Sequence, residues 1–368
     1  MTGNFRHVPE MDYLRAFAIL GVLAVHVAAN FTTIPEINSL LITNVVIDIF
    51  MHVALPLFIF LSGFLLYLKY NRNYSLKEFA QKRFLRVIPP YLIFTVFYLF
   101  IWVIFMGIIT GIYNWPSVSE IGYAFLTAGA SYHLWFFLLI IEFYFLYPII
   151  VKIYHYFEDT NREWLFLLLA LVIQSGWLIF GSNYLFHISG SELNITNIVF
   201  FSRLFYFALG IYVCNHYTQI KEQVLKKSIR TYVIPVILFT CIGSGLWLRG
   251  IQVYGSFSAI QSGTYSLYEL LLQPLFYLFI FALLFVISNR IVSSGKPGKW
   301  LLLIGAYSFG IYLIHPFFLS CTSYGLNLMG ITNLTWIYYV ILFVSTLVCS
   351  MIFVWIMQKV PFHKYILG

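Results

Sequence analysis

Charge is scarce in this chain, and the scarcity excludes the soluble globular proteins. Only 9% of the 368 residues are Asp, Glu, Lys or Arg, whereas 61% are hydrophobic and the mean hydropathy is +0.88. A soluble domain carries about 25% charged residues. The composition therefore predicts an all-α polytopic integral membrane protein, in which apolar helices face lipid.

Cysteine is scarce as well, and several sequence signals are missing. The four cysteines lie in or beside apolar runs without a CxxC or metal-ligand spacing, so we expect no disulfide and no metal site. The chain has no low-complexity segment, no internal repeat and no inverted pair of broken helices, which is the pattern of many transporters. We also expect no cleavable signal peptide and no extra soluble domain. Residues 1–368 are therefore predicted to form a single membrane-embedded domain.

Long apolar runs are abundant. Runs of about 17 or more residues predict ten transmembrane helices, since this length crosses the hydrocarbon core. The expected spans are 13–31, 42–68, 88–110, 133–154, 164–181, 198–215, 232–249, 268–288, 301–320 and 334–357. The second run is too long for one straight helix, so we expect either a separate outer segment or a kink near Pro56. Residues 112–131 are expected to be re-entrant or interfacial.

The basic residues determine the expected orientation. All but three of the 21 lysines and arginines fall on one side of the predicted spans, and the exceptions are Arg15, Arg203 and Arg249. Cytoplasmic loops are rich in Lys and Arg, so both termini are predicted to be cytoplasmic in a multi-pass protein of the cell membrane. The net charge of +8 does not indicate nucleic-acid binding, because the charges occupy short loops beside membrane lipid.

The first span carries two polar residues that are costly to bury. Arg15 lies near its cytoplasmic end and His26 in its outer half, roughly 16 Å apart along a helix. Ionisable residues within spans are candidates for function by default. A neutral imidazole can act as a general base. The alternatives are that His26 is a packing histidine and that Arg15 only snorkels to the phosphate head groups.

A second basic element precedes the third span. Arg83 and Arg86 are three residues apart and share a helix face, which suits bidentate binding of phosphate. Pro89 and Pro90 are predicted to stop that helix at the membrane surface. The alternative is an ordinary cytoplasmic loop, which explains the charges but not their placement.

Further polar residues gather toward the outer halves of the spans. They are Asp48, His52, His133, Glu142, Arg203, Glu269 and His315. Counted from the inner ends of their helices, His26 and His315 both lie roughly 20 Å from the cytoplasmic face. An ion pair of Arg203 with Glu142 or Asp48 would explain some of the charges, but not two histidines at one depth.

The spacing along the first span suggests a donor substrate. If the donor is a coenzyme A thioester, its phosphates need a cationic site at the cytoplasmic mouth. The distance from this mouth to His26 is comparable with the length of the pantetheine arm. The acceptor cannot be read from the sequence. Trp115 and the aromatic residues of the outer loops 182–197 and 250–266 could stack on sugar rings or form an interfacial belt.

Four motifs in order resemble the acyltransferase family 3. They are YLRAFAILGVLAVH ending at His26, FIFLSGF at 58–64, RFLR at 83–86 and YLIHP at 312–316. This family comprises integral membrane O-acyltransferases, including O-acetyltransferases, that modify surface polysaccharides and other exported carbohydrates. The second motif departs mildly, with Ile59 between two phenylalanines. Together the motifs extend from residue 13 to residue 316, so the resemblance covers essentially the whole chain.

The resemblance implies transfer of an acetyl or other short acyl group from cytoplasmic acyl-coenzyme A, expected to be acetyl-coenzyme A, to a hydroxyl of an extracytoplasmic glycan or glycolipid. It implies that His26 is catalytic and requires Arg15. Arg83 and Arg86 would bind the donor together with Arg15. Glu142 resembles a further acidic position of the family. His315, in the last motif, completes the expected catalytic set.

The sequence also admits two other interpretations. The chain could export a polysaccharide or lipid-linked saccharide without covalent chemistry, in which case acyl-coenzyme A would not change its melting temperature. It could instead be an assembly subunit among envelope-biosynthesis partners, in which case charged substitutions at His26 would be tolerated. The paired arginines and the histidines at one depth favour the enzyme.

Overall fold

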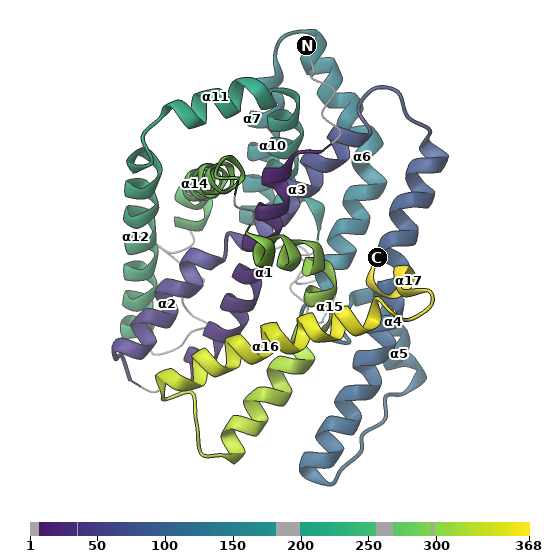
Figure 1. The fold of residues 1–368 in the computed structure, drawn as a ribbon, viewed down its shortest axis with the longest axis vertical. Coiled ribbons are helices and arrows are strands. Elements are labelled where there is room, and N and C mark those ends of the chain that lie inside the picture. The colour runs from purple at the N-terminus through teal and green to yellow at the C-terminus, as the bar shows by residue number, and fades with distance from the viewer. Residues whose placement is uncertain (1–6, 35, 182–198, 255–267, 296–297) are drawn as a thin grey trace. The chain divides into compact units, whose positions relative to one another are not determined.

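The computed structural model describes residues 7–34, 36–181, 199–254, 268–295 and 298–368. Among these residues every regular element is a helix, which confirms the all-α class (Figure 1). Loop 182–197 and most of loop 250–266, both expected on the outer side, lie outside the described residues. The chain forms two compact units, and each is described by itself.

The first unit comprises Met1–Leu65 and Val213–Phe353. The last residues of α3 and of α16 belong to the second unit. Its elements are α1 (Pro9–Ala28), η1 (Ala29–Thr33), α2 (Ser39–Met51), α3 (Ala54–Lys69), α11 (Tyr217–Lys226), α12 (Arg230–Tyr254), η5 (Tyr268–Leu272), α14 (Gln273–Ser293), α15 (Lys299–Leu328) and α16 (Trp336–Met357).

The second unit comprises Leu66–Tyr212 and Val354–Gly368. Its elements are α4 (Leu76–Thr110), α5 (Val118–Thr127), α6 (Trp135–Asp159), α7 (Glu163–Gly176), η2 (Trp177–Gly181), η3 (Phe200–Arg203), α10 (Leu204–Asn215) and α17 (His363–Leu367). Helix α6 packs between α4 and α7, and α17 packs against α4.

Each of the ten expected spans corresponds to a helical segment. Within the described ranges, nine segments are long and apolar enough to cross a membrane. The sixth expected span is shorter, because its helical residues run from Phe200 to Asn215. Helix α5 has only 10 residues, too few to span the hydrocarbon core, and so it agrees with the re-entrant or interfacial expectation for 112–131. The protein is a multi-pass membrane protein.

The second expected span is interrupted at His52. Helix α2 ends at Met51 and α3 begins at Ala54. Pro56 lies in the first turn of α3, where a backbone N–H has no acceptor within the helix, so the missing N–H of proline costs nothing. If α2 continued directly into α3, the proline ring would collide with the carbonyl of His52, four residues earlier. The interruption therefore lies four residues before Pro56. His52 is the residue that follows the end of α2, within the second apolar span.

The predicted helix stop at Pro89 and Pro90 is wrong. Helix α4 continues through both prolines to Thr110. In an α-helix these prolines remove the hydrogen bonds to the carbonyls of Leu85 and Arg86. Both of these residues are exposed, so water or lipid head groups can satisfy the two carbonyls at little cost. The helix consequently carries Arg83 and Arg86 on the same rigid element as the third span.

Helix α1 lies at the centre of the first unit and contacts α2, α14 and α15. At its start, the buried Glu10 carboxylate accepts hydrogen bonds from Lys221 Nζ at 2.6 Å and Asn289 Nδ2 at 2.9 Å. Just past its C-terminal end, in η1, the Asn30 carbonyl accepts a hydrogen bond of 3.0 Å from the Asn333 side chain. Breaking a buried ion pair is costly, so the Glu10–Lys221 contact holds the start of α1 firmly.

Candidate active site

Two histidines predicted to lie at one depth are in direct contact. The rings of His26 on α1 and His315 on α15 stack with their centroids 5.2 Å apart and their planes 24° apart. His315 is completely buried, and its Nδ1 contacts the Tyr312 carbonyl at 2.8 Å. His26 is partly exposed. His26 is thus the more accessible member of the pair, and the buried ring of His315 stacks against it.

The sequence sets this contact through one glycine. A Cβ atom on Gly305 would lie 2.4 Å from the Asp12 carbonyl oxygen and 3.5 Å from the Ala16 nitrogen, so the backbones of α15 and α1 touch there. From Ala16 to His26 and from Gly305 to His315 the chain advances ten residues, or roughly 15 Å, in each helix. The two helices therefore run parallel, and equal steps from one close contact bring the rings to the same level.

A pair formed by His52 and the carboxylate of Asp48 lies beside His26. His52 Nδ1 lies 2.8 Å from the Asp48 carbonyl oxygen and 3.3 Å from the Asp48 carboxylate. Both side chains interact electrostatically with His26, and Glu269 interacts with His52 in the same way. The spacing of Asp48 and His52 is visible in the sequence. Their proximity to His26 follows only from the packing of α1 against α2.

Arg15 has an acidic partner on its own helix. Its Nη1 donates to Asp12 Oδ1 at 3.0 Å, and His7 Nε2 contacts the other carboxylate oxygen of Asp12 at 2.7 Å. The Arg15 side chain keeps 36% of its surface exposed. The guanidinium is therefore oriented by Asp12 and remains partly exposed.

In the second unit, Arg83 is held by an aromatic ring. Its guanidinium carbon lies 4.9 Å from the centroid of the Tyr70 ring, a cation–π geometry. The Arg83 Nε is buried and has no hydrogen-bond partner among the described residues. Arg86, one turn further along α4, is exposed. One guanidinium is thus held against an aromatic ring with an unsatisfied donor, and its neighbour one turn along α4 is exposed.

Glu142 also belongs to the second unit and has a structural contact. Its Oε2 accepts a hydrogen bond of 2.7 Å from the backbone N–H of Phe200, the first residue of η3. A carboxylate there satisfies one of the N–H groups left open at a helix start. Among the described residues Glu142 and Arg203 form no ion pair. The contact joins positions 58 residues apart, so no local pattern could have predicted it.

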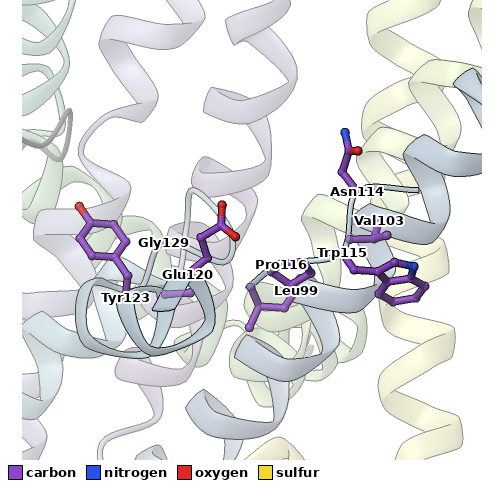
Figure 2. Close-up of a pocket in the computed structure, with 9 residues that line it drawn as sticks. Leu99, Val103, Asn114, Trp115, Pro116, Glu120, Tyr123 and Gly129 are labelled. Atoms are coloured by element: carbon purple, nitrogen blue, oxygen red, sulfur yellow. The ribbon is translucent and has the colours of Figure 1, made fainter. Parts of the chain in front are cut away.

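A cavity of about 340 Å³ opens between α4 and the segment that leads into α5 (Figure 2). Its lining combines the aromatic side chains of Trp115 and Tyr123 with the polar side chains of Asn114 and Glu120. Hydrogen bonds from the Ser117 side chain and backbone hold the pKa of the Glu120 carboxyl below its usual range. The cavity therefore presents a charged acceptor beside aromatic faces.

One protein-family model matches nearly the whole chain. A family model described as an acyltransferase domain, that of acyltransferase family 3, matches residues 8–355. No solved structure gives a significant match.

Curated relatives are similar over most of their length. A protein of Staphylococcus epidermidis, named a probable poly-beta-1,6-N-acetyl-D-glucosamine export protein, is 27% identical over 321 residues, which are 84% of this chain and 81% of the relative. A protein of the same name from Staphylococcus aureus strain MSSA476 is 26% identical over 330 residues, 84% of this chain and 82% of the relative. Since the family model spans more than nine-tenths of its residues, the chain belongs to the acyltransferase family 3.

Proposed function

We propose that this protein is an integral membrane O-acyltransferase. It moves an acetyl or other short acyl group from cytoplasmic acyl-coenzyme A to a hydroxyl of an extracytoplasmic glycan or glycolipid. The observation that carries the proposal is the His26–His315 stack between α1 and α15, in a chain that belongs to an acyltransferase family. A partly exposed imidazole fixed against a buried ring has the placement that a general base requires.

The proposed chemistry is acyl transfer at a thioester. His26 takes the proton of the acceptor hydroxyl while the hydroxyl oxygen attacks the thioester carbonyl carbon. A C–O bond forms, the C–S bond breaks, and the electron pair of the C–S bond leaves with sulfur. The complete burial of His315 favours a positioning role for this residue, in which the ring fixes the orientation of His26 without touching the substrate.

The proposed donor contacts are arginines. Arg83 and Arg86 bind phosphate groups of the donor, which would satisfy the buried Nε of Arg83. Arg15, oriented by Asp12, is a further proposed contact for the anionic part of the donor. Along α1 the distance from Arg15 to His26 is roughly 16 Å, comparable with an extended pantetheine arm. The basic residues on the predicted cytoplasmic side support a donor that enters from the cytoplasm.

The proposed acceptor is a saccharide, and the cavity beside α5 is a candidate contact for it. Aromatic faces suit the apolar faces of sugar rings, and ionised Glu120 and Asn114 suit sugar hydroxyls. In the predicted topology this segment lies outside the cytoplasm. The names of the relatives suggest N-acetylglucosamine polymers as the first acceptors to test.

Export without covalent chemistry is the second candidate, and the names of the relatives favour it. An exporter would bind and move saccharide but would not consume acyl-coenzyme A. The two functions are separated by purified protein, acetyl-coenzyme A and an oligomer of β-1,6-linked N-acetylglucosamine. The enzyme transfers label from acetyl-coenzyme A to an acceptor oxygen and releases free coenzyme A. Vesicles that accumulate unmodified oligomer, with no free coenzyme A released, would establish export instead.

Mass spectrometry of cell-surface glycans identifies the natural acceptor. Glycans from cells with the protein are compared with glycans from cells without it and from cells that produce the His26→Ala variant. The enzyme predicts an ester-linked acyl group that is present only with the unaltered protein. Identical glycans in all three samples would exclude surface O-acylation.

A further inference from the structure

The Asp48–His52 pair lies where a membrane helix is broken, and it has no role in the chemistry described so far. His52 is the C-terminal cap of α2, and Pro56 prevents the helix from continuing past it. A helix interruption inside a membrane is tolerated where other groups satisfy the backbone or where water reaches it. The imidazole of His52 remains 51% exposed, whereas only 13% of the Asp48 side chain is exposed.

The contacts of His52 define which nitrogen carries a proton. Its Nδ1 faces two oxygens of Asp48, the carbonyl at 2.8 Å and the carboxylate at 3.3 Å. Both are acceptors, so Nδ1 must be the donor. Nε2 is then the nitrogen available for exchange with a substrate, and it has no hydrogen-bond partner among the described residues. A ring oriented by a carboxylate at one nitrogen, with the other nitrogen open, is the arrangement of a catalytic proton carrier.

A comparison with His155 shows that this arrangement is not simply that of any histidine beside an acid. In α6 of the second unit, His155 Nδ1 contacts Glu158 Oε2 at 2.8 Å. Its Nε2 faces the Asn71 carbonyl at 3.5 Å, and only 14% of its side chain is exposed. Both of its nitrogens are occupied in holding the 71–72 turn against α6. His52 shares the carboxylate contact but leaves the second nitrogen open.

We infer that His52 is a second catalytic residue of the acyl-transfer site, with Asp48 as its positioning residue. The inference rests on the proposed function and adds a proton donor to it. His52 and His26 lie near enough to interact electrostatically, and they come from different helices of the same unit. The proton donor is assigned to His52, because the Asp48 oxygens that face its Nδ1 can stabilise positive charge on the ring. The proton acceptor is assigned to His26.

This division of roles balances the reaction. The acceptor O–H proton passes to His26 as the C–O bond forms, and the departing thiolate sulfur takes the Nε2 proton of His52 as the C–S bond breaks. The products are the ester and the thiol, with His26 protonated and His52 neutral. Transfer of one proton from His26 to His52 restores the starting state. No other reactant is needed.

The role of His52 is tested by comparing acetyl-coenzyme A with a donor whose leaving group needs no proton. The main variant is His52→Asn, because an asparagine amide can replace the Nδ1–H donor to Asp48 but cannot deliver a proton to sulfur. His52→Gln serves as a second variant in case the first does not fold. His155→Asn is the matched control. Purified proteins are assayed for acetyl transfer to a β-1,6-linked N-acetylglucosamine oligomer, with acetyl-coenzyme A or 4-nitrophenyl acetate as donor. The nitrophenolate leaving group needs no protonation.

With acetyl-coenzyme A, the His52 variants should be slower by about 100-fold or more, the usual scale of a lost general acid. With 4-nitrophenyl acetate they should stay within a few-fold of the unaltered protein. Asp48→Asn should show the same donor dependence with a smaller loss, and His155→Asn should match the unaltered protein with both donors. Acetyl-coenzyme A should still bind the His52 variants, as measured by its shift of the melting temperature.

Two results would overturn the inference while the proposed function stands. One is a His52→Asn or His52→Gln protein that transfers from acetyl-coenzyme A at nearly the unaltered rate. The other is an equal loss with both donors in a variant that folds and binds acetyl-coenzyme A. If the unaltered protein itself transfers no acetyl group from acetyl-coenzyme A, the proposed function fails, and the inference fails with it.

Discussion

His26 and His315 face each other as stacked rings, 5.2 Å between centroids, although 289 positions separate them in the sequence. The contact exists because α1 and α15 run parallel from a point where Gly305 touches the backbone of Asp12. A histidine stack placed by backbone packing has a fixed geometry. Changes to this packing should therefore alter the position of His26.

Replacing Gly305 should disturb the site from a distance. In Gly305→Ala the new methyl group would lie 2.4 Å from the Asp12 carbonyl oxygen, so α15 must move away from α1. We expect a lower melting temperature and loss of most acyl transfer, since core overpacking costs about 1–3 kcal/mol. Gly325→Ala is the control on the same helix, because a Cβ there meets nothing within 4 Å. Equal behaviour of the two variants would contradict the proposed packing.

The role of His315 can be separated from that of His26 by a ring that stacks but cannot carry a proton. His315→Phe should keep more acyl transfer than His315→Ala, because a phenyl ring still supports His26 and fills the buried space. His315→Ala opens a cavity, and such changes cost about 2–5 kcal/mol. The rate of acetyl transfer and the melting temperature are measured for both. Complete inactivity of a folded His315→Phe protein would assign His315 a direct part in the chemistry.

Much of the helix pattern could be predicted from hydrophobicity alone. All ten apolar runs are helical, because the length and composition of a span are local properties of the sequence. The common depth of His26 and His315 followed from the rise per residue and the assumption that both helices start on one side. The 5.2 Å stack agrees with it.

Other features depended on contacts that local rules do not contain. The double proline at 89–90 suggested a helix stop, but the exposed positions of Leu85 and Arg86 make the lost hydrogen bonds inexpensive. The bond from Phe200 to Glu142 joins two separate helices. The break at His52 agrees with the kink expected near Pro56, because the proline ring collides with the carbonyl of the residue four positions earlier. Its importance appears only when α2 packs against α1.

Arg83 should contribute to donor binding. In Arg83→Gln we expect acetyl-coenzyme A to bind about 10- to 100-fold more weakly, corresponding to a lost charge-assisted hydrogen bond of about 1.5–3 kcal/mol. The control is Arg72→Gln, whose exposed guanidinium pairs with Glu158 and Asp159 in the same unit. Titration calorimetry with acetyl-coenzyme A measures both. If Arg72→Gln weakens binding as much as Arg83→Gln, general loss of positive charge explains the effect and a phosphate site at Arg83 is excluded.

Trp115 should contribute to acceptor binding. Trp115→Ala removes an aromatic face from the cavity, and we expect the KM for a β-1,6-linked N-acetylglucosamine oligomer to rise several-fold while the KM for acetyl-coenzyme A stays unchanged. Trp164→Ala is the control, because this tryptophan is also exposed, at 62%, but lies on α7 outside the cavity. An unchanged acceptor KM in Trp115→Ala would show that the cavity does not bind the acceptor.

The central claim is that His26 performs acyl transfer, and isotope transfer by the purified protein tests it most directly. Unaltered and His26→Gln proteins are reconstituted in vesicles with acetyl-coenzyme A labelled in the acetyl group and the β-1,6-linked N-acetylglucosamine oligomer. We predict that the unaltered protein places label on an acceptor oxygen, and that His26→Gln, folded and still able to bind acetyl-coenzyme A, does so at least about 100-fold more slowly. Equal label from both proteins would contradict the account.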